Sequence, residues 1–170
     1  MTDIAAPTGW TDNGLAPTRG ILAEAVVAEL CWEKQPGTLW KGGRNAGFDV
    51  VSDDGRFDAK VVTLDKDGWI VLFRDNARPF NVDKVDFIVL VVLDNSTCRS
   101  TVDLEEGTVK FAASASVNSV WNVPVSAMNA AMPKHTANDP KWRKVLINPE
   151  VLAEYKVKIG ASSAQSTSTN

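Results

Sequence analysis

Two aspartates and a lysine lie close together in residues 47–60, which read GFDVVSDDGRFDAK. Apolar segments rich in Val and Phe flank an Asp-Gly pair, and this combination is the strongest short-range signal for a two-residue hairpin turn. Because side chains alternate along a strand, Asp49, Asp58 and Lys60 are predicted to project from one face of the hairpin. Two carboxylates and an ammonium group on one patch are what divalent-metal chemistry on a phosphodiester requires.

The predicted register follows from the turn. With Asp54 and Gly55 as the loop, Asp49 faces Lys60 across the hairpin. A three-residue loop would send Asp49 to the other face unless a bulge restored it. The alternative interpretation is a cross-strand Asp–Lys pair on a solvated sheet face, which contributes only about 0.2–1 kcal/mol.

Three patterns describe the elements that must position these groups. Residues 19–33 have helical periodicity, and Glu24 lies on an otherwise apolar side of that helix. A glutamate that extends from the helix end into solvent is the alternative. The apolar run at residues 85–93 predicts a central strand that is buried on both faces. A second Asp-Gly pair, at residues 67 and 68, predicts a second hairpin.

The remaining elements are weaker in pattern. Strands are predicted at residues 109–113 and 119–123, and a short helix at residues 126–132. Asn148 followed by Pro149 is typical of a helix start, since Asn caps the first turn and Pro fits its first position. The expected fold is α/β, with a mixed central sheet flanked by helices.

The chain is expected to form one domain with two extensions. Residues 1–16 predict an irregular N-terminal arm, because glycine, proline and asparagine recur in them. Residues 17–160 are long enough for a single domain with a substantial core. Residues 161–170 are of low complexity and are expected to be disordered.

Composition limits the class of protein. The net charge of −3 over 170 residues argues against a protein that coats nucleic acid by charge alone. Cys31 and Cys98 are far apart and have neither metal-ligand spacing nor the pattern of a disulfide framework. No signal segment and no apolar run of about 18 residues is present, so we expect a cytoplasmic protein without a membrane partner.

A glycine-rich, basic loop precedes the first strand of the hairpin. It contains Trp40, which could stack on a base, together with Lys41 and Arg44, which could contact phosphate. Packing within the protein is the alternative for Trp40. Arg74, Arg78 and the basic residues 141–144 could also contact phosphate, although such charges are more often solvated surface. His135 is the only histidine, which is weak support for zinc or for a catalytic triad.

The order of these motifs resembles the PD-(D/E)xK nuclease superfamily. The matching segments are RGILAE at residues 19–24, GFD at 47–49 and DAK at 58–60, and the resemblance covers roughly residues 19–125. Phe48 stands where the family has a proline, and Asp58 stands where glutamate is commoner. The resemblance implies a restriction-endonuclease-like core and a metal-dependent endonuclease that acts on nucleic acid, with DNA expected.

In that interpretation, Asp49 and Asp58 hold Mg²⁺, or alternatively Mn²⁺, and the backbone carbonyl of Ala59 is a further ligand. Lys60 orients the attacking water or stabilises the transition-state oxygens. Glu24 approaches the metal from the helix, directly or through water.

Two alternatives stay open. The first is a nuclease-fold protein without catalysis that binds DNA or a protein, for example in phage–host conflict or as an assembly subunit. The second is an unrelated α+β binding domain in which Asp49, Asp58 and Lys60 form surface salt bridges. A homodimer is compatible with each of these interpretations.

Overall fold

The computed structural model describes most of the chain between residues 48 and 159 and short segments before it. The described residues are 2–4, 20, 22–24, 26–27, 39–40, 48–75, 78–94, 96–97, 99–105, 108–133 and 142–159.

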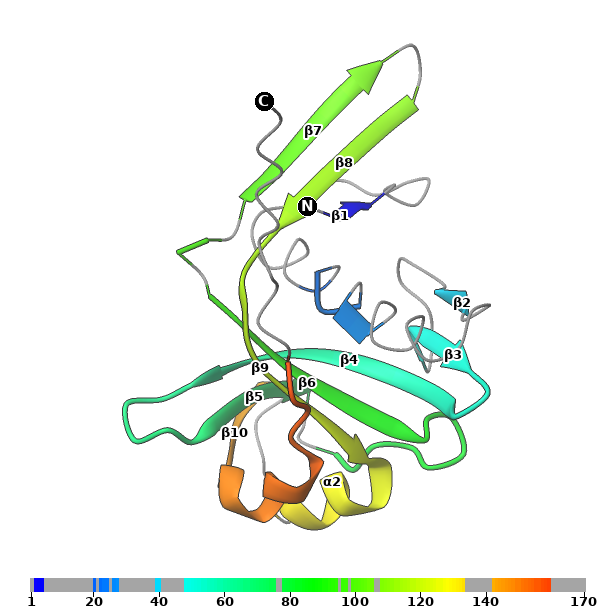
Figure 1. Cartoon of the computed structure of the whole chain (residues 1–170). Helices are drawn as coiled ribbons and strands as arrows, with labels where there is room; N and C mark the ends of the chain where they lie inside the picture. The colour runs from blue at the N-terminus through cyan, green and yellow to red at the C-terminus, as the bar shows by residue number, and fades with distance from the viewer. Residues whose placement is uncertain are drawn as a thin grey trace, which may run out of the picture.

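A mixed sheet of seven strands forms the centre of this part of the protein (Figure 1). Its strands are β2 (Leu39–Trp40), β3 (Val50–Ser52), β4 (Gly55–Leu64), β5 (Ile70–Asp75), β6 (Phe87–Leu93), β9 (Val117–Pro124) and β10 (Trp142–Ile147). Five of them follow the order β10-β5-β4-β3-β2, while β6 pairs with β4 and with β9. The pairing of β4 with β6 is parallel and the other pairings are antiparallel. The mixed α/β fold is therefore confirmed.

Strand β6 lies inside the sheet, as its apolar sequence predicts. Every residue from Ile88 to Leu93 is buried. Alternate side chains of the strand enter two separate cores, so that Leu90 packs on one face of the sheet and Val91 on the other. A strand with partners on both edges and cores on both faces exposes neither face to solvent. Its sequence therefore does not alternate between apolar and polar residues.

The first core lies between the sheet and two short helices that follow β9 and β10 (Figure 1). Helix α2 (Val125–Ala131) contributes Met128, and the 3-10 helix η1 (Pro149–Tyr155) contributes Leu152. Asn148 caps η1 by accepting a hydrogen bond from the Glu150 amide at 3.0 Å. Both predicted helix positions are confirmed, and the second is a 3-10 helix.

The second core lies on the opposite face of the sheet. Residues 20, 22–24 and 26–27, the described part of the predicted first helix, are helical. Leu22, Ala23 and Val27 pack there against Phe57 and Val89. Because β4 and β6 are packed between the two cores, their positions are fixed. Strand β4 contains Asp58 and Lys60 of the predicted site.

A separate three-stranded sheet extends from the end of the β6–β9 pair (Figure 1). It has the order β1-β8-β7, with β1 at Thr2–Ile4, β7 at Arg99–Glu105 and β8 at Thr108–Ser114. The predicted strand at 109–113 is confirmed as β8. Strand β1 lies within the segment that was expected to be an irregular arm, and β2 within the expected glycine-rich loop. Strands β7 and β10 were not predicted.

The second hairpin forms where the Asp-Gly pair predicts it, but its loop consists of residues 66–68 and not of Asp67 and Gly68 alone. Leu64 pairs with Ile70, the Asp65 amide donates to the Trp69 carbonyl at 2.9 Å, and Gly68 takes a positive φ of 82° in the turn. Asp65 stabilises that turn by accepting hydrogen bonds from the amides of Asp67 and Trp69. None of the helices among the described residues has the length and apolar character needed to span a membrane.

Candidate functional site

The first hairpin, between β3 and β4, differs in register from the sequence prediction. Ser52 pairs with Gly55, and Val51 pairs with Arg56, so the loop consists of Asp53 and Asp54. The expectation that Asp54 and Gly55 form the loop, and that Asp49 faces Lys60, is wrong by two residues. A shift of two residues conserves the side on which each side chain projects. The prediction that Asp49, Asp58 and Lys60 share a side therefore survives the change.

The shift has a tertiary cause. Gly55 takes a φ of 140°, and a Cβ atom there would lie 3.1 Å from Oδ2 of Asp86. The residue without a side chain is thus used where β4 passes the start of β6, and not in the turn. The next residue, Arg56, donates to Asp86 through its amide at 2.8 Å, its Nε at 2.9 Å and its Nη2 at 2.9 Å.

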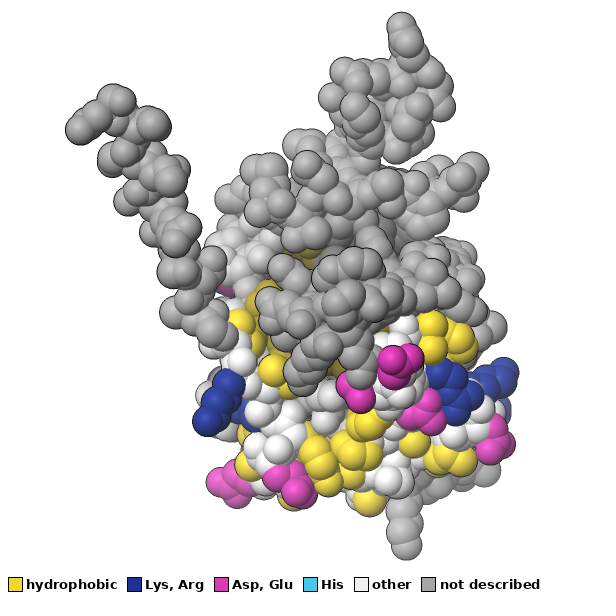
Figure 2. All heavy atoms as spheres, turned by 45° about the vertical axis from the view of Figure 1, so that its right-hand side comes forward, with side chains coloured by type: hydrophobic (Ala, Val, Ile, Leu, Met, Phe, Trp, Pro, Cys, Tyr) yellow, Lys and Arg dark blue, Asp and Glu magenta, His cyan; other side chains and the backbone are white. Residues whose placement is uncertain are grey.

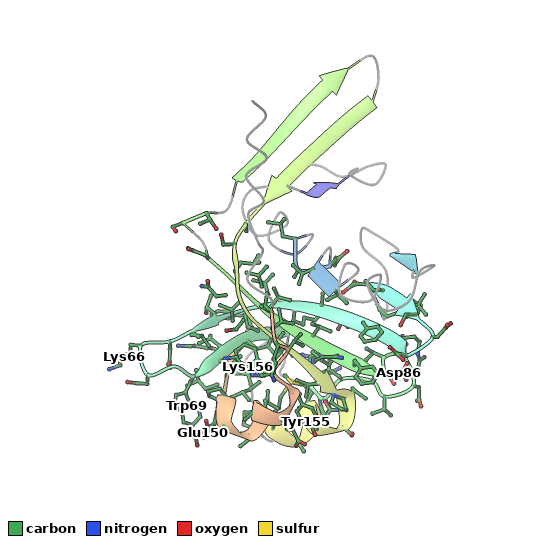
Figure 3. The ribbon with its side chains drawn as sticks, in the orientation of Figure 1. Lys66, Trp69, Asp86, Glu150, Tyr155 and Lys156 are labelled. Atoms are coloured by element: carbon green, nitrogen blue, oxygen red, sulfur yellow. The ribbon has the colours of Figure 1, made fainter. Side chains whose placement is uncertain are left out.

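These bonds attach the hairpin to the segment before β6. The Arg56 guanidinium and amide lower the pKa of Asp86 to about 2. Arg56 also donates to the Asp83 carbonyl oxygen at 2.6 Å. Figure 2, in which this side of the molecule comes forward, has acidic and basic side chains next to each other. Figure 3 labels Asp86 on the right, at the end of the sheet opposite Lys66.

The polar groups of the hairpin gather at an open stretch of the β4 edge. On this edge β3 pairs as far as Phe57, and β5 begins to pair at Thr63. Among the described residues, no strand pairs with the stretch between them on this edge. Asp49 lies here: its amide donates to the Phe57 carbonyl at 2.8 Å, and its Oδ2 accepts from the Ala59 amide at 2.8 Å.

A side-chain oxygen thus replaces a strand partner at Ala59. The N–H and C=O groups of one strand residue point to the same edge. The Ala59 carbonyl therefore faces the same open stretch as the Asp49 carboxylate. Lys60 Nζ lies 3.3 Å from that carbonyl oxygen and also forms an ion pair with Asp58. The Asp58 side chain is only 15% exposed, so this pair is shielded from water more than a typical surface pair.

Carboxylates crowd around Asp49. Burial and the charges of Asp58 and Glu24 together raise the pKa of Asp49 to about 7, against the opposing effects of Lys60 and the Ala59 amide. The structure therefore brings together three of the predicted site residues, Asp49, Asp58 and Lys60, which line one pocket. Glu24, on the first helix, contributes through the effect of its charge on the pKa of Asp49.

A pocket of about 260 Å³ opens at this point. Its lining residues are Asp49, Asp58, Lys60, Arg74, Phe80, Asn81, Lys84 and Val85. The sequence suggests Arg74 only as one of several phosphate contacts and does not predict its position in one pocket with Asp58. Alternation along β5 contains that signal, since Ile70 and Leu72 are in the first core and Arg74 shares their side. Asn81 and Lys84 are on a loop, where no periodicity predicts direction.

The donors at the open edge suit a hard divalent cation. Asp49, Asp58 and the Ala59 carbonyl supply oxygen ligands, and Mg²⁺ usually takes one or two protein carboxylates. Burial and the neighbouring carboxylates raise the pKa of Asp49, and a bound cation would favour its charged form. Among the described residues, no cluster of three or more His, Cys, Asp or Glu side chains is arranged to hold a metal ion. The residues fit Mg²⁺ only with the carbonyl and solvent or substrate as further ligands.

The predicted nucleic-acid contacts lie largely outside the described residues. Lys41 and Arg44 lie outside the described residues. His135 and both cysteines, which were not predicted to bind nucleic acid, lie outside them too. For Trp40 the structure describes only the backbone, which forms the end of β2.

Comparison with protein-family models, with curated proteins and with solved structures finds no match to this chain. The function must therefore be argued from the site itself.

Proposed function

We propose that the protein is a metal-dependent nuclease that hydrolyses phosphodiester bonds in nucleic acid, with DNA as the expected substrate. The observation that carries the proposal is the convergence of Asp49, Asp58 and Lys60 on the open edge of β4, in a pocket that also contains Arg74. Phosphodiester hydrolysis needs oxygen ligands for a metal and cations for the phosphate in the same place. The resemblance to the PD-(D/E)xK superfamily, and with it a restriction-endonuclease-like core, belongs to this proposal.

Each group has a role that follows from its contacts. Asp49 and Asp58 would hold Mg²⁺ or Mn²⁺ together with the Ala59 carbonyl. The bound ion would neutralise charge on the phosphoryl oxygens and make water a better nucleophile. Lys60, which contacts both Asp58 and the Ala59 carbonyl, would orient that water or stabilise the developing negative charge. Glu24, which acts on the charge of Asp49, would complete the shell through water.

The pocket supports a polymeric substrate. Its volume of about 260 Å³ is below the roughly 300–1,000 Å³ of sites that enclose a small molecule. It is lined by charged groups and has room for a phosphodiester and its flanking atoms. A strand of nucleic acid could lie across it while the bases remain outside.

A second candidate is a binding module with this arrangement but without catalysis. It is favoured by the Lys60–Asp58 ion pair, which already neutralises one of the two carboxylates, and by Phe48 in place of the family's proline. Such a protein would bind DNA or a protein partner through the same surface.

Plasmid cleavage in Mg²⁺ separates these candidates. We expect the wild type to nick or linearise supercoiled DNA, and Lys60→Ala and Asp58→Ala to lose at least about 100-fold in rate, because such groups act as a unit. Lys66→Ala is the matched control, since Lys66 is exposed in the turn at the opposite end of the sheet from Asp86 (Figure 3). EDTA should abolish cleavage.

A calorimetric titration with Mg²⁺ completes the test. Binding to the wild type and its loss in Asp58→Asn are expected for the nuclease. DNA binding without metal binding or cleavage would favour the binding module. If wild type neither binds Mg²⁺ nor cleaves DNA or RNA, the nuclease proposal is wrong.

A further inference from the structure

Arg74 is a cation that lines the pocket, and within the described part of the chain one of its buried donors has no partner. Its guanidinium lies over the Phe80 ring, with Cζ 3.6 Å from the ring centroid. Its Nη1 atom is buried and has no hydrogen-bond partner. Among the described residues Arg74 forms no ion pair either, because the nearby Asp58 pairs with Lys60. Burial accordingly lowers the pKa of Arg74, while the charge of Asp58 opposes that effect.

An unpartnered buried donor in a folded protein requires an explanation, since the great majority of such groups are paired. An arginine that served only to balance Asp58 would be expected to bond to it, because guanidinium and carboxylate match each other in shape. Here the guanidinium is stacked on a ring, which leaves its donors in the plane available to another acceptor.

The backbone of Phe80, the residue whose ring lies under Arg74, is held by two hydrogen bonds. Asn129 of α2 accepts a hydrogen bond from the Phe80 amide at 2.7 Å and donates to the Phe80 carbonyl at 3.0 Å. Phe80 itself is only 6% exposed and belongs to the first core. The stack is therefore preorganised by the fold, which reduces the entropy lost when a ligand binds.

The pocket has two kinds of lining group. Asp49 and Asp58 are acidic, whereas Arg74 and Lys84 are basic, and Asn81 lies among them. Acidic groups repel a phosphate, so the phosphate oxygens must be met from the basic side of the pocket, whether or not a cation is bound to the acidic groups. Arg74 lines the pocket on this basic side, so a movement of its side chain would bring one of its donors to a phosphate oxygen.

We propose that Arg74, supported by Phe80 and Asn129, binds a phosphate group of the nucleic-acid backbone in this pocket. The inference rests on the proposed function, because it names the part of the substrate that this side of the site holds. It also assigns α2 a role in positioning substrate, through Asn129 and the Phe80 ring.

Binding of a fluorescein-labelled 20-nucleotide DNA strand in EDTA, followed by anisotropy, tests the proposal without any cleavage. We expect Arg74→Gln to raise the Kd at least about tenfold and to lower the salt dependence by about one phosphate contact. The Kd of Arg74→Lys should lie between those of the wild type and Arg74→Gln, because lysine keeps the positive charge but lacks the planar arrangement of donors. Lys66→Gln, which removes an equal charge far from the pocket, should stay within about twofold of the wild type.

Phe80→Leu provides a second variant that keeps the arginine and removes its stacking ring. A weaker Kd in this variant, with melting temperature measured alongside, is expected if the ring positions the guanidinium. Should Arg74→Gln unfold the protein, the Arg74→Lys and Phe80→Leu values decide the question. Wild-type affinity in Arg74→Gln, an equal loss in Lys66→Gln, or no binding of DNA by the wild type would overturn the inference.

The outcome is separable from that of the cleavage assay. Arg74-dependent binding without cleavage in Mg²⁺ would leave this inference intact and exclude the nuclease. Cleavage that is unaffected by Arg74→Gln, with unchanged Kd, would exclude the role of Arg74 and leave the nuclease intact.

Discussion

The carboxyl group of Asp49 has two functions in the structure that oppose each other. Its Oδ2 replaces a strand partner for the Ala59 amide, which favours the charged form. Burial and the charges of Asp58 and Glu24 favour the neutral form, and together they prevail, since the pKa is raised to about 7. Without a cation, the site therefore carries an aspartate that costs stability whenever it is ionised.

This gives stability a specific pH dependence. The unfolded chain releases the Asp49 proton near pH 3.8, whereas the folded protein keeps it up to about pH 7. In that interval the folded state binds more protons, so the free energy of unfolding falls as pH rises. Between pH 5 and pH 8, we expect the free energy of unfolding of the metal-free wild type to fall by on the order of 2 kcal/mol more than that of Asp49→Asn. Urea unfolding at each pH measures this difference. Asp67→Asn, in an exposed turn, is the control and should behave as the wild type. Equal pH dependence in all three would contradict this account.

At the scale of elements, β4 combines structural and site functions along one strand. Its odd-numbered residues, such as Phe57, pack in the second core, while Asp58 and Lys60 project to the other face. The strand is fixed at its start by Gly55 and Arg56 against Asp86. We infer that this attachment sets the register of β3 on β4. The register determines that the Asp49 carboxylate lies next to the Ala59 amide.

Two glycines allow this attachment to be tested. Gly55→Ala introduces a Cβ 3.1 Å from Asp86 Oδ2 at a φ of 140°, whereas Gly68→Ala, at a φ of 82°, meets no atom within 4 Å. Both variants carry backbone strain of about 1–3 kcal/mol. Only Gly55→Ala has the additional contact, so we expect it to be destabilised by at least about 1 kcal/mol more than Gly68→Ala in urea unfolding. Similar losses in the two variants would mean that the turn, and not the approach to Asp86, requires the glycine.

At the scale of the whole molecule, two cores on opposite faces of one sheet support the site. The open edge of β4 lies between β3 and β5, so it depends on both hairpins and on the strands that hold them. The end of the first core is η1, where Leu152 is only 1% exposed. The residues after 160 have no large apolar side chain, and their sequence predicts disorder.

Two truncations test this boundary. A chain that ends at residue 160 should keep its melting temperature within about 2 °C and keep its DNA binding, because the removed residues cannot bury enough surface to offset the entropy of ordering them. A chain that ends at residue 148 loses Leu152 from the core and should melt roughly 5 °C lower or more. A drop of several degrees in the first truncation would indicate that residues 161–170 dock on the domain.

The sequence by itself determined those features that depend on neighbouring residues. Side-chain alternation with a period of two puts Asp49, Asp58 and Lys60 on one side whichever of the two registers forms. The apolar run of β6, the Asp-Gly turn before β5 and the Asn-Pro start of η1 are local in the same sense. Each of them was predicted and is present.

Only the tertiary structure decided features that join distant residues. The register of β3 on β4 depends on Arg56 and Asp86, which are 30 residues apart, and the Arg74 stack depends on Phe80 and Asn129, which are 49 apart. Strands β1 and β10 likewise exist through pairing with distant partners. The free energy of such contacts arises when the chain is folded, because only then do Gly55 and the carboxylate of Asp86, in the segment before β6, come into contact. A local sequence pattern does not predict contacts between residues that are so far apart in the chain.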